Sequence, residues 1–183
     1  MRSRKADALR KAYAKHGDKV DIIVIEDLIK GDFTDALKGV SAVIHVATAI
    51  PGREELRDIL EVCNLPAHSP ILNLHQLPQI TREGALNIIR QAVAAGVKHV
   101  GFLGTVAALM DFSSPVVKAP LSDKDWNPLS EEHALASGNG MLVYSVAKTQ
   151  AEKALWKFAE EHPELNLTTG TPWISSIMCR CYP

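Results

Sequence analysis

The chain has 183 residues, 46% of them hydrophobic, and its 20 basic and 21 acidic side chains leave a formal net charge of −1. This length and charge balance predict one soluble domain with a substantial core, and they give no sign of nucleic-acid binding. No apolar run has the length of a membrane span or of a signal peptide, so we expect a cytoplasmic protein without a membrane partner. The three cysteines lack metal-ligand spacing, and we expect neither a disulfide framework nor a metal site.

Helical and extended patterns alternate along the chain. Apolar positions at helical spacing, or short β-branched runs, mark each predicted element. The helices are expected at residues 6–16, 34–38, 81–95 and 142–161, the strands at 20–25, 41–47, 99–103 and 165–169, and a loop at 113–127. The run at 20–25 is almost continuously apolar, as in a strand that is buried on both faces of a parallel sheet. Strands separated by helices predict a doubly wound α/β sheet.

A Tyr-x-x-x-Lys pair, Tyr144 and Lys148, lies near the start of the last predicted helix. Residues four apart share a helix face, so the Lys148 ammonium can lie near both the Tyr144 phenol and a cofactor ribose. A free tyrosine has a pKa of about 10, and a neighbouring positive charge would lower that pKa and suit Tyr144 to general acid catalysis. Thr105, at the end of a predicted strand, can offer its hydroxyl to the same substrate oxygen. A solvent-exposed helix pair is the alternative explanation of so short a motif.

Longer segments carry a family resemblance. They are Asp27-Leu28, residues 32–40, 45–48 and 86–100, and Asp125-Trp126-Asn127-Pro128. Together they resemble the extended short-chain dehydrogenase/reductases, the NAD-dependent epimerase/dehydratase family, and within it the dihydroflavonol reductase, cinnamoyl-CoA reductase and fungal aldehyde/ketone reductase branch. The resemblance implies a Rossmann fold, NADP(H) rather than NAD(H), and reduction of a small-molecule aldehyde or ketone. It also implies a catalytic triad of Thr105, Tyr144 and Lys148.

The same resemblance implies a set of cofactor contacts. Besides Tyr144 and Lys148, the implied cofactor-binding residues are Arg2, Arg4, Asp27, Leu28, Val46, Ala47, Thr48 and Pro172. Asp27 and Leu28 match an adenine-contacting pair, the segment 46–48 matches the ribose and pyrophosphate side, and Pro172 matches a proline beside the nicotinamide. Arg2 or Arg4 matches an arginine that pairs with the 2′-phosphate of NADPH. An exposed helix start explains these two arginines equally.

Three departures from the family pattern change what we expect of the chain. It begins where the family's second strand has ended, so it lacks the first strand and the Gly-x-x-Gly-x-x-Gly turn that seats the pyrophosphate. Residues 62–79, with three prolines, interrupt a stretch that is continuous in relatives, and residues 170–183 replace the substrate-binding part. We expect one partial NAD(P)-binding domain over residues 1–183, with an incomplete Rossmann-like, mostly parallel sheet that lacks the first two strands, an irregular insertion at 62–79 and an atypical tail at 170–183. Retained introns would explain both unusual segments.

Three functions stay open at this point. The first is NADPH-dependent reduction of an aldehyde or ketone to an alcohol, with this chain an inactive or weakly active fragment. The second is a nucleotide-sugar epimerase/dehydratase or a hydroxysteroid dehydrogenase-like enzyme, because those relatives share the triad. The third is a non-catalytic Rossmann-like remnant that pairs its exposed edge with another chain.

Overall fold

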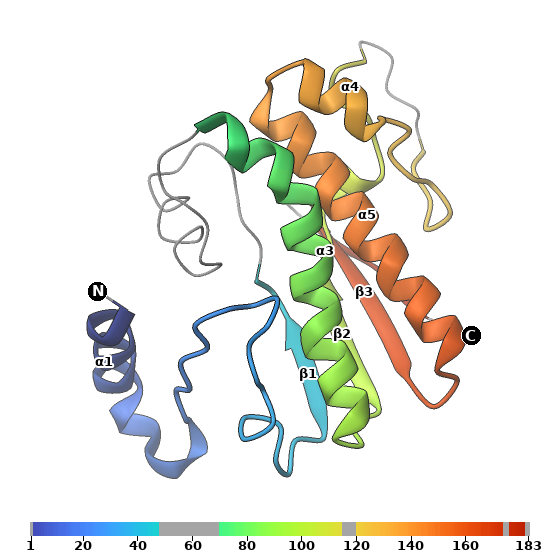
Figure 1. Cartoon of the computed structure of the whole chain (residues 1–183). Helices are drawn as coiled ribbons and strands as arrows, with labels where there is room; N and C mark the ends of the chain where they lie inside the picture. Colours follow the sequence, from blue (N-terminus) through green and yellow to red (C-terminus); the bar gives the residue numbers. More distant parts are fainter. Residues whose placement is uncertain (1, 48–69, 115–119, 174–175, 182–183) are drawn as a thin grey trace.

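The computed structural model describes residues 2–47, 70–114, 120–173 and 176–181 (Figure 1). Its elements in chain order are α1 (Arg2–Tyr13), η1 (Ala14–Lys19), β1 (Ala42–His45), α3 (Pro70–Ala94), β2 (His99–Leu103), η2 (Val106–Ala108), α4 (Glu131–Ala136), α5 (Gly140–Glu161), β3 (Asn166–Trp173) and β4 (Ser176–Cys181). None of the described helices combines the length and the apolarity that crossing a bilayer requires.

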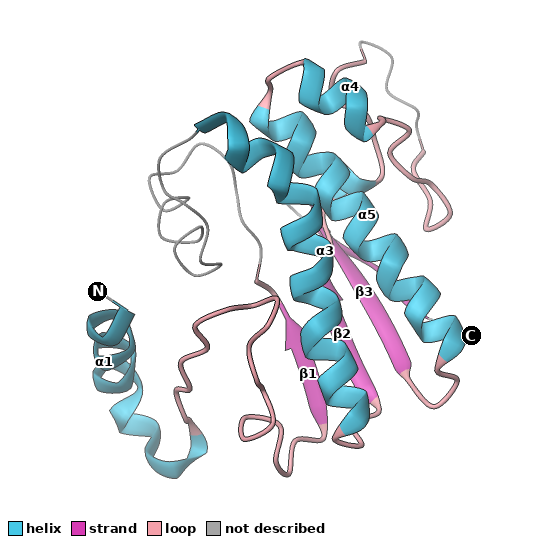
Figure 2. Ribbon diagram, in the orientation of Figure 1, coloured by secondary structure: helices cyan, strands magenta, loops and turns pink. Residues whose placement is uncertain are grey.

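The strands form one sheet in the order β1-β2-β3-β4. The first three strands are parallel, and β4 runs antiparallel to β3. The crossover helices α3 and α5 lie side by side on the same face of this sheet (Figure 2). Two successive crossovers on one face are what one half of a doubly wound sheet requires, since right-handed connections that advance in one direction place their helices on the same side. The expected α/β class with a mostly parallel sheet is confirmed.

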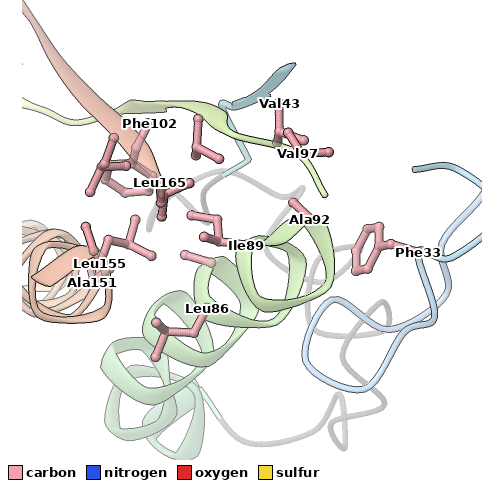
Figure 3. Close-up of a cluster of buried hydrophobic side chains, with 14 of the residues drawn as sticks. Phe33, Val43, Leu86, Ile89, Ala92, Val97, Phe102, Ala151, Leu155 and Leu165 are labelled. Atoms are coloured by element: carbon pink, nitrogen blue, oxygen red, sulfur yellow. The ribbon is translucent and has the colours of Figure 1, made fainter. Parts of the chain in front are cut away.

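The core lies between the sheet and these two helices (Figure 3). Every second residue of a strand faces the helices, and small residues on the helices let the two layers approach closely. The buried apolar side chains that meet there include Val43, Val100, Phe102, Leu165 and Leu167 from the sheet side, Leu86, Ile89 and Ala92 from α3, and Ala151 and Leu155 from α5. Full burial of each large apolar side chain contributes about 1.5–3 kcal/mol, so this layer is what holds α3 and α5 in register with the strands.

Most expected elements are present with shifted ends. The largest shift is in α3, which begins at Pro70 rather than at residue 81. The part of segment 62–79 from Pro70 onward is therefore helical and not irregular, while 62–69 lies outside the described residues. Pro78 lies inside this helix. Because proline lacks an N–H and usually interrupts a helix, the sequence did not predict helix before residue 81. Leu77 nevertheless packs in a second buried cluster with Leu142 and Val146 of α5.

Two expectations about the N-terminal part are wrong. Residues 20–25 form no strand, and Ile23 and Val24 are exposed. An apolar run becomes a strand only where a neighbouring strand accepts its hydrogen bonds, and this segment has no such neighbour in the described sheet. Residues 34–38 form turns instead of a helix, ending at Gly39 with a φ of 70°.

The C-terminal strand extends further than expected. β3 continues beyond residue 169 to Trp173, and β4 pairs with it in antiparallel register, Gly170 opposite Cys179. The described part of the tail at 170–183 thus completes one edge of the sheet. Nothing in the local pattern predicted this pairing, because the edge that β4 covers exists only in the assembled sheet.

Candidate active site

Thr105 lies just past the carboxyl end of β2. Gly104 N–H donates to the Gly170 carbonyl at 2.8 Å, which ties the end of β2 to β3. Thr105 has extended backbone angles and caps η2, its Oγ1 accepting from Ala107 N at 3.3 Å. The buried Asn127 side chain donates to the Ala107 carbonyl at 2.9 Å and holds this short turn in place. The hydroxyl of Thr105 is therefore fixed where parallel sheets bind their ligands.

Tyr144 reaches the same place from the first turns of α5. That helix begins at Gly140, where the Asn139 side chain caps it by accepting from Met141 N at 2.9 Å. The partly buried Tyr144 phenol makes a side-chain hydrogen bond with Thr105. Burial raises the pKa of Tyr144 above its ordinary value, and the hydrogen bond with Thr105 offsets part of that rise. The structure thus brings together the two hydroxyls that the sequence singled out.

Lys148 lies one turn further along α5 and is only 2% exposed. Its Nζ donates to the Leu103 carbonyl at 2.8 Å and stands 4.2 Å from the centroid of the Phe102 ring. Burial lowers the pKa of Lys148 to about 8, and the negative charge of Glu152 opposes this shift. We expected the charge of Lys148 to lower the pKa of Tyr144, and this is wrong for the described structure. The Tyr144 pKa is raised because burial outweighs every other influence on it.

Two titratable side chains that we did not single out as site residues border Lys148. Glu152 is fully buried, and its Oε1 accepts from Thr169 Oγ1 at 2.8 Å. The His45 ring lies 5.5 Å from the Phe102 ring, and burial, aided by the charge of Lys148, lowers the pKa of His45 to about 4. A sequence signal for Glu152 does exist, because it follows Lys148 by four residues on the helix face that the apolar positions mark as buried.

The expected cofactor residues are only partly brought together. Val46 and Ala47 follow the carboxyl end of β1, and the register of His45 with Phe102 places them beside the end of β2. Both residues are exposed. Asp27 and Leu28 lie elsewhere, in a turn against α3 in which Asp27 Oδ1 accepts from Ile29 N at 2.7 Å.

The remaining expected cofactor contacts are only partly described. Arg2 and Arg4 belong to α1, which stands apart from the sheet and its two covering helices in Figure 1, and Pro172 lies in β3 opposite Ile177. The side chains of these three residues, and Thr48 as a whole, lie outside the described residues.

Comparisons with known proteins agree with this architecture. No family model matches the chain. It is 26% identical to a ketoreductase of Penicillium rubens over 86% of its own length, and 25% identical to aldehyde reductase 2 of Sporidiobolus salmonicolor over 93%. It is also 26% identical to the NADPH-dependent methylglyoxal reductase of Saccharomyces cerevisiae. These matches take up 42%, 47% and 43% of the relatives, so the chain spans less than half the length of the curated relatives it matches.

Solved structures share the fold. The NADPH complex of Gre2 from Candida albicans superposes with a TM-score of 0.68 at 23% identity, covering 91% of this chain and 46% of that one. The yeast methylglyoxal/isovaleraldehyde reductase Gre2 with NADPH gives a TM-score of 0.66 at 22% identity, with the same two coverages. The fold is of the Rossmann type, and the relatives and structural neighbours that the chain resembles are reductases of the short-chain dehydrogenase/reductase, NAD-dependent epimerase/dehydratase type. Within that class, the proteins it resembles are fungal and yeast reductases of aldehydes and ketones.

Proposed function

We propose that this chain carries the proton-transfer part of an NADPH-dependent carbonyl reductase, which converts an aldehyde or ketone to an alcohol. The observation that carries the proposal is the hydrogen bond between Tyr144 and Thr105 at the carboxyl end of β2, with Lys148 one turn away. The relatives that are named reductases of carbonyl compounds support it, as do the solved neighbours with bound NADPH. They favour reduction over the epimerase and dehydratase alternatives.

In this proposal bound NADPH would supply the hydride for the carbonyl carbon and would thereby be oxidised to NADP⁺. Tyr144 gives its phenolic proton to the carbonyl oxygen, which becomes the alcohol hydroxyl, and regains a proton from solvent. Thr105 donates a hydrogen bond to the same oxygen and stabilises the negative charge that develops there. A phenol that stays protonated at neutral pH, as the raised pKa of Tyr144 requires, is in the right state to act as the acid.

The described residues fit one end of the cofactor better than the other. The exposed residues Val46 and Ala47 follow β1 beside the end of β2 that leads to Thr105, where a ribose and nicotinamide would have to pass. Lys148 would bind the ribose hydroxyls, and Asp27 with Leu28 would hold the adenine. The 183 residues contain no Gly-x-x-Gly-x-x-Gly turn to bind the pyrophosphate. We therefore propose weak NADPH affinity and little or no turnover for this chain by itself.

Two measurements test the proposal. A tryptophan-quenching titration with NADPH should give no binding in the micromolar range, and micromolar affinity would contradict the expectation of a weak fragment.

NADPH oxidation at high enzyme concentration, with a small aldehyde in excess, should then give residual turnover. Tyr144→Phe should reduce that turnover at least a hundredfold, since general acid catalysis contributes about 10²–10⁴. Tyr13→Phe, a change of an exposed tyrosine on α1, is the matched control. Turnover that survives Tyr144→Phe would exclude Tyr144 as the acid.

A further inference from the structure

A buried carboxylate lies directly behind the proposed catalytic lysine. Glu152 follows Lys148 by one turn of α5, and its side chain is 0% exposed. Removing a carboxylate from water is costly unless charges and hydrogen bonds compensate it. Thr169 on β3 supplies one such bond, its Oγ1 donating to Glu152 Oε1 at 2.8 Å, and the charge of Lys148 supplies attraction. The carboxylate thus connects α5 with β3 in the same buried layer as the Lys148 ammonium.

The same carboxylate lies against the backbone that leads to Thr105. A Cβ built on Gly104 would stand 2.8 Å from Glu152 Oε2, and 3.4 Å from both the Gly170 carbonyl and Thr171 Oγ1. Only a residue without a side chain lets the carboxylate approach the end of β2 this closely. The carboxylate is therefore packed closely against Gly104, whose own N–H is bonded to the Gly170 carbonyl.

The groups around Lys148 differ in how strongly they stabilise its positive charge. His45 on β1 is held neutral and adds no favourable charge, and the nearby Tyr144 phenol is neutral as well. The Phe102 ring and the Leu103 carbonyl on β2 contribute a π face and one hydrogen bond acceptor. Of these groups Glu152 carries the full negative charge, so it is the group best able to keep the ammonium at this location.

We propose that Glu152 is a positioning residue, which holds the Lys148 ammonium against the Leu103 carbonyl. This inference rests on the proposed function for its catalytic meaning, because Lys148 is assigned to the site there. Its physical content is independent of turnover and can be measured on the folded chain.

The test is the pKa of Lys148, followed by NMR of the lysine Cε signals in a pH titration, with the Lys148 signal assigned from Lys148→Arg. Glu152→Gln keeps the shape and an oxygen that can accept from Thr169, but removes the charge. We expect it to lower the Lys148 pKa by at least one unit from the wild-type value of about 8. Glu160→Gln, an exposed change on the same helix, should leave it unchanged. An unaltered Lys148 pKa in folded Glu152→Gln would overturn the proposal.

A second variant covers the case in which Glu152→Gln does not fold. Thr169→Val has nearly the same volume and removes the hydrogen bond that anchors Glu152, so the Lys148 pKa should fall in the same direction by a smaller amount. If Glu152 served packing alone, both variants would have a lower thermal midpoint and an unchanged Lys148 pKa. The turnover assay of Tyr144→Phe is made separately. Turnover that survives this change would contradict the proposed function and leave the Lys148 result valid.

Discussion

His45 shows how the environment of one side chain sets its chemistry. Its ring is largely buried beside Phe102, at the end of β1, and its Nδ1 has no hydrogen-bond partner in the described part of the chain. Burial first, and then the charge of Lys148, lower its pKa from 6.5 to about 4. The neutral ring therefore tolerates the nearby ammonium, which a charged imidazole would repel.

This shift makes stability depend on pH. The unfolded chain protonates His45 near pH 6.5, whereas the folded chain does so only near pH 4. Between these values the unfolded state binds more protons, so stability falls as the pH is lowered through this window, by up to about 3 kcal/mol for this group. His45→Leu should lack that part of the loss. Urea unfolding of both proteins at pH 7 and pH 4.5 measures the difference, and equal losses would contradict the assignment.

At the scale of elements, two amides on α3 hold the loop that contains Asp27 and Leu28. Asn87 Nδ2 donates to the carbonyls of Leu28 at 3.1 Å and Gly31 at 3.0 Å. Gln91 Nε2 donates to the Gly31 carbonyl at 2.9 Å, and its Oε1 accepts from Phe33 N at 2.8 Å. A segment without helix or strand structure is thus fixed by side chains, which replace the hydrogen bonds that a regular element would supply.

Gln91→Ala should loosen this loop. It leaves the N–H of the buried Phe33 without its acceptor, which costs about 1–3 kcal/mol. We expect a lower free energy of unfolding and faster amide hydrogen exchange at Phe33. Gln79→Ala removes the same side chain from an exposed position of α3 and serves as the control. Unchanged exchange at Phe33 in Gln91→Ala would show that the amide does not hold the loop.

At the scale of the whole molecule, the described helices α3 and α5 cover one face of the sheet and leave the other open. Ile44 on β1 is 78% exposed and Leu103 on β2 is 38% exposed, both on the open face. A shallow groove there is lined by residues of the first three strands, among them His99 and Thr168. β1 is also the last strand at its end of the described sheet. Exposed apolar residues on a strand at the end of a sheet favour self-association.

Ile44→Lys should therefore reduce self-association and change little else. The side chain is exposed, so the free energy of unfolding should stay within about 0.5 kcal/mol of the wild type. Val43→Lys, one position away on the buried face, should unfold the chain, because it places a charge in the core. Sedimentation velocity over a range of concentrations measures association. Equal association of the wild type and Ile44→Lys would remove the open face as its cause.

Local patterns in the sequence predict several of the helices and strands correctly. Hydrophobic spacing predicted the bounds of β2, the course of α5 and the existence of α3. It does so because the apolar residues of a helix or strand recur with the period of that element and form its buried face. The Tyr144 and Lys148 pair was predicted to share a site with Thr105, because residues four apart lie on one helix face and Thr105 follows the carboxyl end of a strand. The catalytic roles of Thr105, Tyr144 and Lys148 stay predictions until the variants are measured.

Other features depend on contacts that form only when the chain folds. Residues 20–25 have the composition of a strand but no neighbour to pair with, whereas the tail forms β4 because the edge of β3 accepts it. The pKa values of Tyr144 and Lys148 depend on burial, which reverses the effect expected from their spacing on the helix. Pairing and burial join residues far apart in the chain, such as Glu152 with Thr169 and His45 with Phe102, and no local pattern contains that information.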